Sequence, residues 1–120
     1  MKKMQEIKPR QENKVSEATP NVAATVEAVF GCKWSLRILG LIREGINRPG
    51  AIERALEGLT PKVQSYYFHR MIGLGILEKT IYPEVPPRVE YRLTSFGLRF
   101  MPVLDSIKAL QRELEERSKE

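Results

Sequence analysis

The sequence predicts a mostly α-helical fold with a small β-hairpin, arranged as a winged helix-turn-helix. Three observations within residues 58–94 support this fold class. Thr60 and Pro61 mark a helix start, because threonine caps a helix N-terminus and proline fits its first turn. Gly75 can end that helix, since glycine accepts the left-handed conformation common there. Residues 76–82 and 88–93 are short runs rich in β-branched, aromatic and aliphatic residues, as strands are.

The two strand-like runs are expected to pair as an antiparallel hairpin. Favourable cross-strand pairs stabilise such a pairing. The expected register sets Leu77 against Leu93, Ile81 against Val89, and Glu78 against Arg92. The loop between them carries Pro83, Pro86 and Pro87, which fix φ and remove backbone donors. The tip is therefore expected to be a stiff, extended wing that cannot lengthen the sheet.

Four further helices are expected along the chain, at residues 20–30, 33–44, 49–57 and 94–117. Asn21 and Thr94 would cap the first and the last of them. Residues 49–57 and the helix starting at Thr60 are joined by a tight turn, which makes the helix-turn-helix unit. Pro102 is expected to kink or divide the last helix.

The last helix carries more apolar positions than packing on a small domain requires, which indicates dimerisation through terminal helices. The candidate dimerisation residues are Val26, Trp34, Leu104, Ile107, Leu110 and Leu114.

The composition of the chain limits the kinds of function that it can have. The 120 residues carry a net charge of +5 and a pI near 9.5, which favours an anionic partner. No apolar run approaches the roughly 20 residues that span a bilayer, and no signal peptide is recognisable, so a cytoplasmic location is expected. No nucleophile, base or metal set converges by sequence, so we expect no enzyme, cofactor or metal site.

The chain divides into a basic arm, residues 1–19, and one DNA-binding and dimerisation domain, residues 20–120. The arm is mostly charged and polar and is expected to be disordered when unbound. Its basic residues would suit either a DNA-backbone contact or a solubilising tail. They are Lys2, Lys3, Lys8, Arg10 and Lys14.

One face of the helix that starts at Thr60 is the candidate for the DNA major groove. Its members follow helical spacing, and the helix N-terminus suits a phosphate. The predicted DNA-binding residues are Thr60, Lys62, Ser65, Tyr66, His69 and Arg70. The opposite face, with Gln64, Phe68, Met71 and Ile72, is expected to face the core. For His69 the alternative is an ordinary exposed histidine, which is the commoner case, and zinc would need about four convergent ligands.

Arg88 is the candidate contact from the wing. A narrow minor groove attracts arginine, so Arg88 is expected to reach DNA there. The alternative interpretation is an ion pair at the base of the hairpin with Glu84 or Glu90.

Several motifs in this order resemble the HxlR-type transcriptional regulators, winged-helix proteins related to the MarR group. They are GCKW at residues 31–34, GLTPKV at 58–63, GILEK at 75–79, YPEVPPRVEYRLT at 82–94 and MPVLD at 101–105. The resemblance implies a homodimer that binds double-stranded DNA at an inverted repeat and regulates transcription, most simply as a repressor. Three departures stand out: Asn21 where redox-sensing members carry a cysteine, Gln64 at an aliphatic position, and MIGLG at the end of the recognition helix.

Cys32, the single cysteine, is the candidate redox switch. It stands at a predicted helix start beside Lys33, and both features would lower a thiol pKa. The alternative is a small residue packed between helices. No small-molecule effector is indicated.

A second function remains open, namely a winged-helix protein-interaction module with lost or altered DNA readout. Ile72 and Leu74 motivate it, because an exposed apolar patch suits a protein contact. Their burial would favour DNA binding instead.

Overall fold

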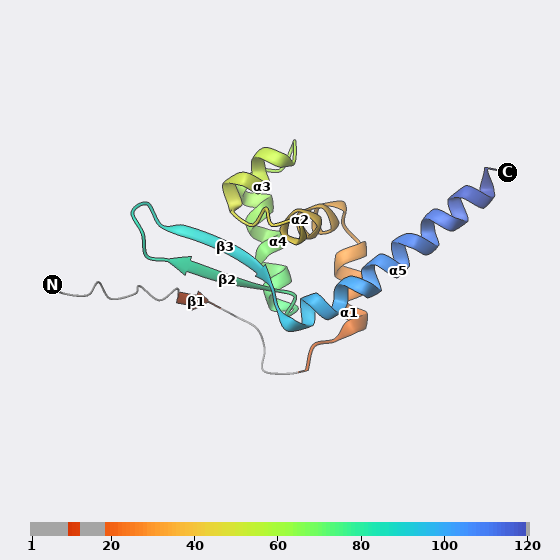
Figure 1. The fold of residues 1–120 in the computed structure, drawn as a ribbon, viewed down its shortest axis with the longest axis horizontal. Helices are drawn as coiled ribbons and strands as arrows, with labels where there is room; N and C mark the ends of the chain where they lie inside the picture. Colours follow the sequence, from red (N-terminus) through yellow and green to blue (C-terminus); the bar gives the residue numbers. More distant parts are fainter. Residues whose placement is uncertain (1–9, 13–18, 120) are drawn as a thin grey trace.

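The computed structural model describes residues 10–12 and 19–119, and it has the predicted winged helix-turn-helix fold. The elements follow in the order β1 (Arg10–Glu12), α1 (Val22–Phe30), α2 (Lys33–Arg43), α3 (Pro49–Ala55), α4 (Pro61–Gly73), β2 (Leu77–Tyr82), β3 (Arg88–Leu93) and α5 (Ser95–Ser118). Figure 1 shows α3 and α2 above the hairpin, with α4 running down behind the base of the hairpin. The hairpin tip and the C-terminal half of α5 project to opposite sides.

Local capping chemistry sets the helix starts, as predicted. The side chain of Asn21 accepts a hydrogen bond from Ala24 N at 3.0 Å, and Thr60 Oγ1 accepts one from Val63 N at 3.2 Å. These bonds satisfy amides that have no partner within the helix. After α4 the chain turns at Gly75, whose φ of 82° suits glycine alone among common residues.

The helix α5 continues through Pro102 from Ser95 to Ser118. Of the two expected outcomes, Pro102 therefore does not divide the helix, and a kink at Pro102 stays a prediction. Met101 and Leu104, on either side of the proline, are 3% and 2% exposed. Their burial anchors both flanking turns to the core, which offsets the loss of one backbone hydrogen bond.

The hairpin has the predicted register. Strand β2 pairs antiparallel with β3, with Leu77 opposite Leu93, Ile81 opposite Val89 and Glu78 opposite Arg92. This register brings apolar side chains opposite one another and an acidic side chain opposite a basic one, and such cross-strand pairs stabilise a hairpin.

A third strand lies on the outer edge of the hairpin. Strand β1 pairs antiparallel with β2 and places Gln11 opposite Thr80, so the sheet order is β1-β2-β3. Nothing in the polar sequence of the arm indicated this strand. For these three residues the structure differs from the expected disorder, while the rest of the arm, at 1–9 and 13–18, lies outside the described residues. The edge pairing supplies backbone partners that the local sequence does not reveal.

The core lies between α2, α4, the hairpin and the first half of α5. Phe68 of α4 stacks on Tyr91 of β3, with ring centroids 3.7 Å apart. The predicted inner face of α4 is buried, with Gln64, Phe68, Met71 and Ile72 at most 6% exposed. Gln64 Nε2 donates to Pro49 O at 2.8 Å, so a polar side chain at this core position ties α4 to the start of α3. None of the helices in the described part of the chain is long and apolar enough to cross a membrane.

Candidate nucleic-acid interface

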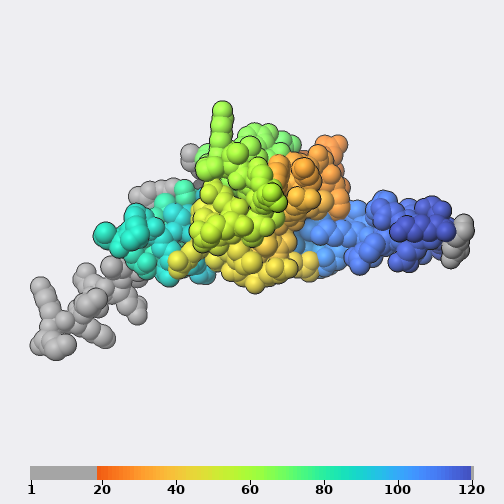
Figure 2. Space-filling model, turned by 90° about the horizontal axis from the view of Figure 1, so that it is seen from above, coloured from red at the N-terminus to blue at the C-terminus, as the bar shows by residue number. Residues whose placement is uncertain are grey.

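The outer face of α4 is free of the core, as its spacing predicted. The residues proposed for DNA contact on this helix are all exposed: Thr60, Lys62, Ser65, Tyr66, His69 and Arg70. Figure 2 shows α3 and α4, in yellow-green and green, as a raised surface with the hairpin on one side and α5 on the other. Because the inner face of α4 is fixed by burial, the outer side chains sit on a rigid support.

Two tyrosines and an arginine are interlocked along α4. Arg70 Nη1 donates to Tyr66 Oη at 3.1 Å, and the rings of Tyr66 and Tyr67 meet edge to face with centroids 5.0 Å apart. In this arrangement the Tyr66 hydroxyl oxygen accepts a hydrogen bond from the Arg70 guanidinium. The hydroxyl proton stays available for donation to a group outside the protein. The face thus presents one hydroxyl donor and one guanidinium side by side.

Cys32 contacts the same helix. It is the N-cap residue of α2, it is half-buried, and its Sγ lies 2.8 Å from Tyr67 Oη. Burial by itself would raise the pKa of Cys32. The Tyr67 hydroxyl, the backbone amides of Trp34 and Ser35 and the charge of Arg70 outweigh that effect and lower the pKa of the thiol.

The expected helix N-terminus contributes to this lowered pKa, whereas Lys33 does not act as expected. Lys33 Nζ lies 5.4 Å from the centre of the Trp34 ring, and Arg70 supplies the positive charge at Cys32 instead. The same contact has the opposite effect on Tyr67, because a neighbouring thiolate favours the protonated phenol. The pKa of Tyr67 is accordingly raised.

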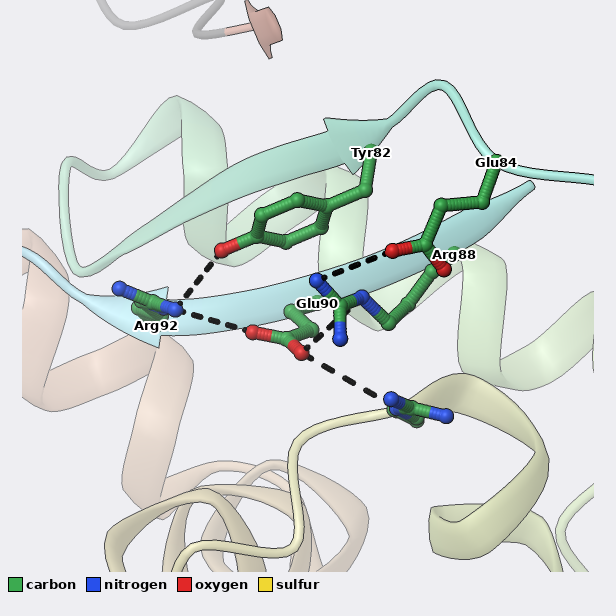
Figure 3. A network of polar contacts seen from close by, with 6 residues as sticks. Tyr82, Glu84, Arg88, Glu90 and Arg92 are labelled. Carbon is green, nitrogen blue, oxygen red and sulfur yellow. Dashed lines mark hydrogen bonds and ion pairs between the residues drawn. The ribbon is translucent and has the colours of Figure 1, made fainter. Parts of the chain in front are cut away.

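Arg88 is held within a network at the base of the wing (Figure 3). Its Nη2 lies 3.3 Å from Glu84 Oε1, its Nε lies 3.7 Å from Glu90 Oε2, and its guanidinium carbon lies 3.9 Å from the centre of the Tyr82 ring. Both acidic partners named in the alternative interpretation are therefore present. The exposed fraction of the Arg88 side chain is 30%.

Arg48 and Arg92 also approach Glu90, and sequence reasoning did not single them out for this site. Arg92 Nη2 donates to Glu90 Oε1 at 3.0 Å and to Tyr82 Oη at 2.9 Å, and Arg48 Nε lies 4.0 Å from Glu90 Oε2. The hydrogen bond to Glu90 raises the pKa of Arg92 further. Arg48 stands directly before the proline that begins α3, a local signal for a helix start but not for contact with the wing.

A cleft of ≈ 490 Å³ separates α3 from the wing. Three arginines line it, Arg48, Arg54 and Arg88, together with Glu84. The cleft is therefore an arginine-rich recess between α3 and the wing.

The proposed dimerisation residues fall into two groups. Leu110 and Leu114 on the outer half of α5 are 57% and 51% exposed, with Ile107 half-buried beside them. Val26 and Trp34 are half-buried on α1 and α2. Leu104, at 2% exposed, belongs to the core of the subunit itself, so its place differs from the expected interface position. Phe100 and Met101 of the same helix are buried in this core as well. Helical spacing alone does not separate residues that face the core from residues that face a second subunit.

Within residues 10–12 and 19–119, no three His, Cys, Asp or Glu side chains converge as a metal site would require.

Comparison with known proteins gives a consistent result. The model of the HxlR-like helix-turn-helix family matches residues 29–119. A helix-turn-helix transcriptional regulator from Synechocystis is 37% identical over 78 residues, which are 65% of this chain and 58% of the relative. A second one, from Methanothermobacter thermautotrophicus, is covered to 60%, so the chain spans about three fifths of the length of these curated relatives.

Solved structures share the fold. A protein from Enterococcus faecalis described as a transcriptional regulator of the MarR family superposes with a TM-score of 0.72 at 27% identity, over 86% of this chain and 97% of its own. The redox regulator HypR in its oxidised form superposes with a TM-score of 0.65 at 26% identity, over 77% of this chain and 94% of its own. The matched proteins are described as regulators of transcription or of redox response, not as enzymes.

Proposed function

Because this chain belongs to the HxlR-like helix-turn-helix family, we propose that it is a sequence-specific, DNA-binding regulator of transcription that acts as a homodimer. One observation carries the proposal: α4 has a buried inner face and an exposed outer face of polar and basic side chains, beside a wing. A helix held in this way can enter the major groove while the wing follows the backbone or the minor groove.

The outer face of α4 offers distinct contacts to DNA. Lys62 suits a guanine edge or a phosphate, and Ser65 suits either base edges or the backbone. Tyr66 would donate its hydroxyl to a phosphate or place its ring on a thymine methyl, with Arg70 beside it. The amides at the start of α4, next to Thr60, suit a phosphate. His69 lies on the same exposed face and completes the proposed set.

We propose that the dimer forms through the terminal helices. Exposed Leu110 and Leu114, with half-buried Ile107, would bury their apolar surface against a second copy of α5, and Val26 and Trp34 would contribute from α1 and α2. A twofold dimer presents its two recognition helices about 34 Å apart, so the operator would be an inverted repeat. A dimer bound there would block polymerase and repress transcription.

Burial at the end of α4 argues against the rival function. Ile72 is 6% exposed and Leu74 is half-buried against the core. The apolar patch that a protein-interaction module would need is therefore largely used inside the subunit.

The test is a binding titration of the reduced protein on the DNA upstream of its own gene, beside a scrambled duplex, at two salt concentrations. Tight binding to the upstream DNA alone, weakened by salt, is expected, because counterions are released from each phosphate contacted. Equal, weak binding to both duplexes would contradict sequence-specific regulation at that site. A footprint without twofold symmetry would contradict the proposed dimeric arrangement.

We propose further that oxidation of Cys32 changes DNA binding. The thiolate would attack a peroxide oxygen, the O–O bond would break with loss of hydroxide, and Cys32 would become a sulfenic acid. Tyr67 Oη lies only 2.8 Å from the sulfur, so an oxygen bonded to the sulfur on that side would crowd the hydroxyl and displace a side chain of the recognition helix. The structural likeness to HypR, described as a redox regulator, supports testing this idea.

Peroxide should weaken binding of the wild type to its operator and leave the Cys32→Ser variant unchanged, with restoration by dithiothreitol. Tyr67→Phe, which removes the hydroxyl donor, should slow the reaction of Cys32 at neutral pH. Equal sensitivity of wild type and Cys32→Ser to peroxide would assign the effect to another group.

A further inference from the structure

We propose that Glu84 occupies Arg88 in the free protein and is replaced by a phosphate of duplex DNA when the wing engages. The phosphate would enter the cleft between α3 and the wing, which Arg48 and Arg54 also line. This inference rests on the proposed DNA-binding function, and it adds a new role for Glu84, Glu90, Arg48 and Arg54.

The contacts of Arg88 are loose compared with those of Arg92. Arg88 meets Glu84 at 3.3 Å and Glu90 at 3.7 Å, and neither contact has hydrogen-bond geometry. Among the described residues, Arg88 Nε is a buried side-chain nitrogen without a hydrogen-bond partner. Arg92, in contrast, donates hydrogen bonds at 2.9 and 3.0 Å to Tyr82 and Glu90. An arginine side chain has five N–H donors, and Arg88 makes no well-formed hydrogen bond with them. Its guanidinium can therefore bind an anion whose oxygens meet these donors at better distances and angles.

Tyr82 and Glu90 hold Arg88 in place for such an exchange. The Tyr82 ring lies under the Arg88 guanidinium, and the hydroxyl of that ring is fixed by Arg92 (Figure 3). The Glu90 side chain is only 12% exposed and faces Arg48, Arg88 and Arg92 together. Glu90 is thus a positioning residue that gathers the arginines, while Glu84, on the loop and 51% exposed, is the partner that can leave.

The cleft has basic residues suited to a phosphodiester. Arg48, Arg54 and Arg88 line it, and Glu84 is the acidic residue that lines it with them. Gly50 forms part of its wall, and a Cβ there would lie 3.3 Å from Arg54 Nη1, so the glycine gives the Arg54 guanidinium room beside the backbone. A phosphate in place of the Glu84 carboxylate would meet several donors instead of one loose contact.

Replacement of Glu84 by a DNA phosphate is favourable because the ion pair between Glu84 and Arg88 in the free protein is weak. Glu84 and Arg88 are 51% and 30% exposed, so solvent screens their attraction. Removing the carboxylate charge should therefore strengthen DNA binding by about two- to fivefold, the range expected when an exposed ion pair no longer competes.

A double-mutant cycle on DNA affinity tests the proposal. Fluorescence anisotropy would measure binding of wild type, Glu84→Gln, Arg88→Ala and the double variant to a labelled mixed-sequence duplex and to the upstream DNA, since phosphate contacts do not depend on sequence. Glu84→Gln is expected to tighten binding in the wild-type background and to have no effect when Arg88 is alanine. The matched control is Glu113→Gln, which removes the same charge from an ion pair of the same 3.3 Å length on α5.

The outcomes separate the two proposals. An equal gain in both backgrounds would show a general charge effect and would overturn the exchange, as would no gain in the wild-type background. If wild type binds neither duplex, the proposed function fails and the exchange fails with it. Thermal unfolding would check that each variant folds, and Arg88→Gln, which keeps part of the buried stem, replaces Arg88→Ala in the cycle if the latter does not.

Discussion

Replacement of Gly97 by alanine should destabilise the junction between α5 and the wing. Gly97 lies buried in the first turn of α5, directly beneath the backbone of Ile76. A Cβ at this position would collide with the Ile76 carbonyl oxygen and would lie 3.2 Å from Leu93 Cδ2. The same carbonyl accepts the Thr94 amide at 2.9 Å, so it cannot move without loss of a backbone hydrogen bond. The start of α5 would have to shift away from the hairpin.

The magnitude follows from two opposing effects. Overpacking a well-packed site costs roughly 1–3 kcal/mol, and a collision with backbone belongs at the upper end of that range. Alanine gains about 0.5–1 kcal/mol over glycine within a helix. The net loss should be about 2 kcal/mol, or a fall in Tm of roughly 8–16 °C for a domain of this size.

Circular dichroism at one fixed protein concentration would measure the change, because the proposed dimerisation would make Tm depend on concentration. Gly40→Ala is the matched control. Gly40 lies within α2 and a Cβ there would meet no heavy atom within 4 Å, so this variant should be slightly more stable than wild type. If Gly97→Ala unfolds at or above the wild-type temperature, the packing argument at the α5 junction is wrong.

Three further predictions concern the interface, a charged pair and the dimer. Lys62→Ala should weaken duplex binding about five- to tenfold and lower the salt slope by about one, with the dimer intact; an unchanged anisotropy titration would remove Lys62 from the DNA face. The hydrogen bonds from Arg43 lower the pKa of Asp105, so their stabilising effect is present above the unfolded carboxyl pKa, near about 3.9, and is lost as pH falls through the folded value. The Tm difference between wild type and Asp105→Asn should therefore be largest near neutral pH and vanish in acid, and a pH-independent difference would refute the assignment. Serine at Leu110 and Leu114 should shift the protein toward folded monomer in sedimentation velocity, because both side chains are exposed in the subunit; an unchanged dimer would place its interface elsewhere.

Much of the fold could be predicted because its signals are local. Side-chain caps at Asn21, Thr60 and Thr94 act within three residues, and all three set helix starts in the structure. The hairpin register could be predicted from favourable cross-strand pairs, with Leu77 opposite Leu93 and Glu78 opposite Arg92. The buried and exposed faces of α4 likewise follow from a period of 3.6 residues.

The missed features depend on partners that are distant in the sequence. Strand β1 exists through its pairing with β2, and Pro102 is tolerated because the core holds the turns on both sides of it. Leu104 has the spacing of an interface residue, yet the subunit core takes it. Spacing along a helix cannot tell which apolar face meets the subunit and which meets a second molecule.

The sequence by itself determined the helices, the wing, its register and the outward face of α4, since these depend on capping, backbone restriction and periodicity within a few residues. Only the tertiary structure decided that Cys32 touches Tyr67, 35 residues away, and that Glu84 and Glu90 hold Arg88. Those contacts determine that the charge of Arg88 is paired and that the pKa of the Cys32 thiol is lowered. They arise from packing of separate elements, and coulombic and hydrogen-bond energies depend on distances that no local pattern fixes.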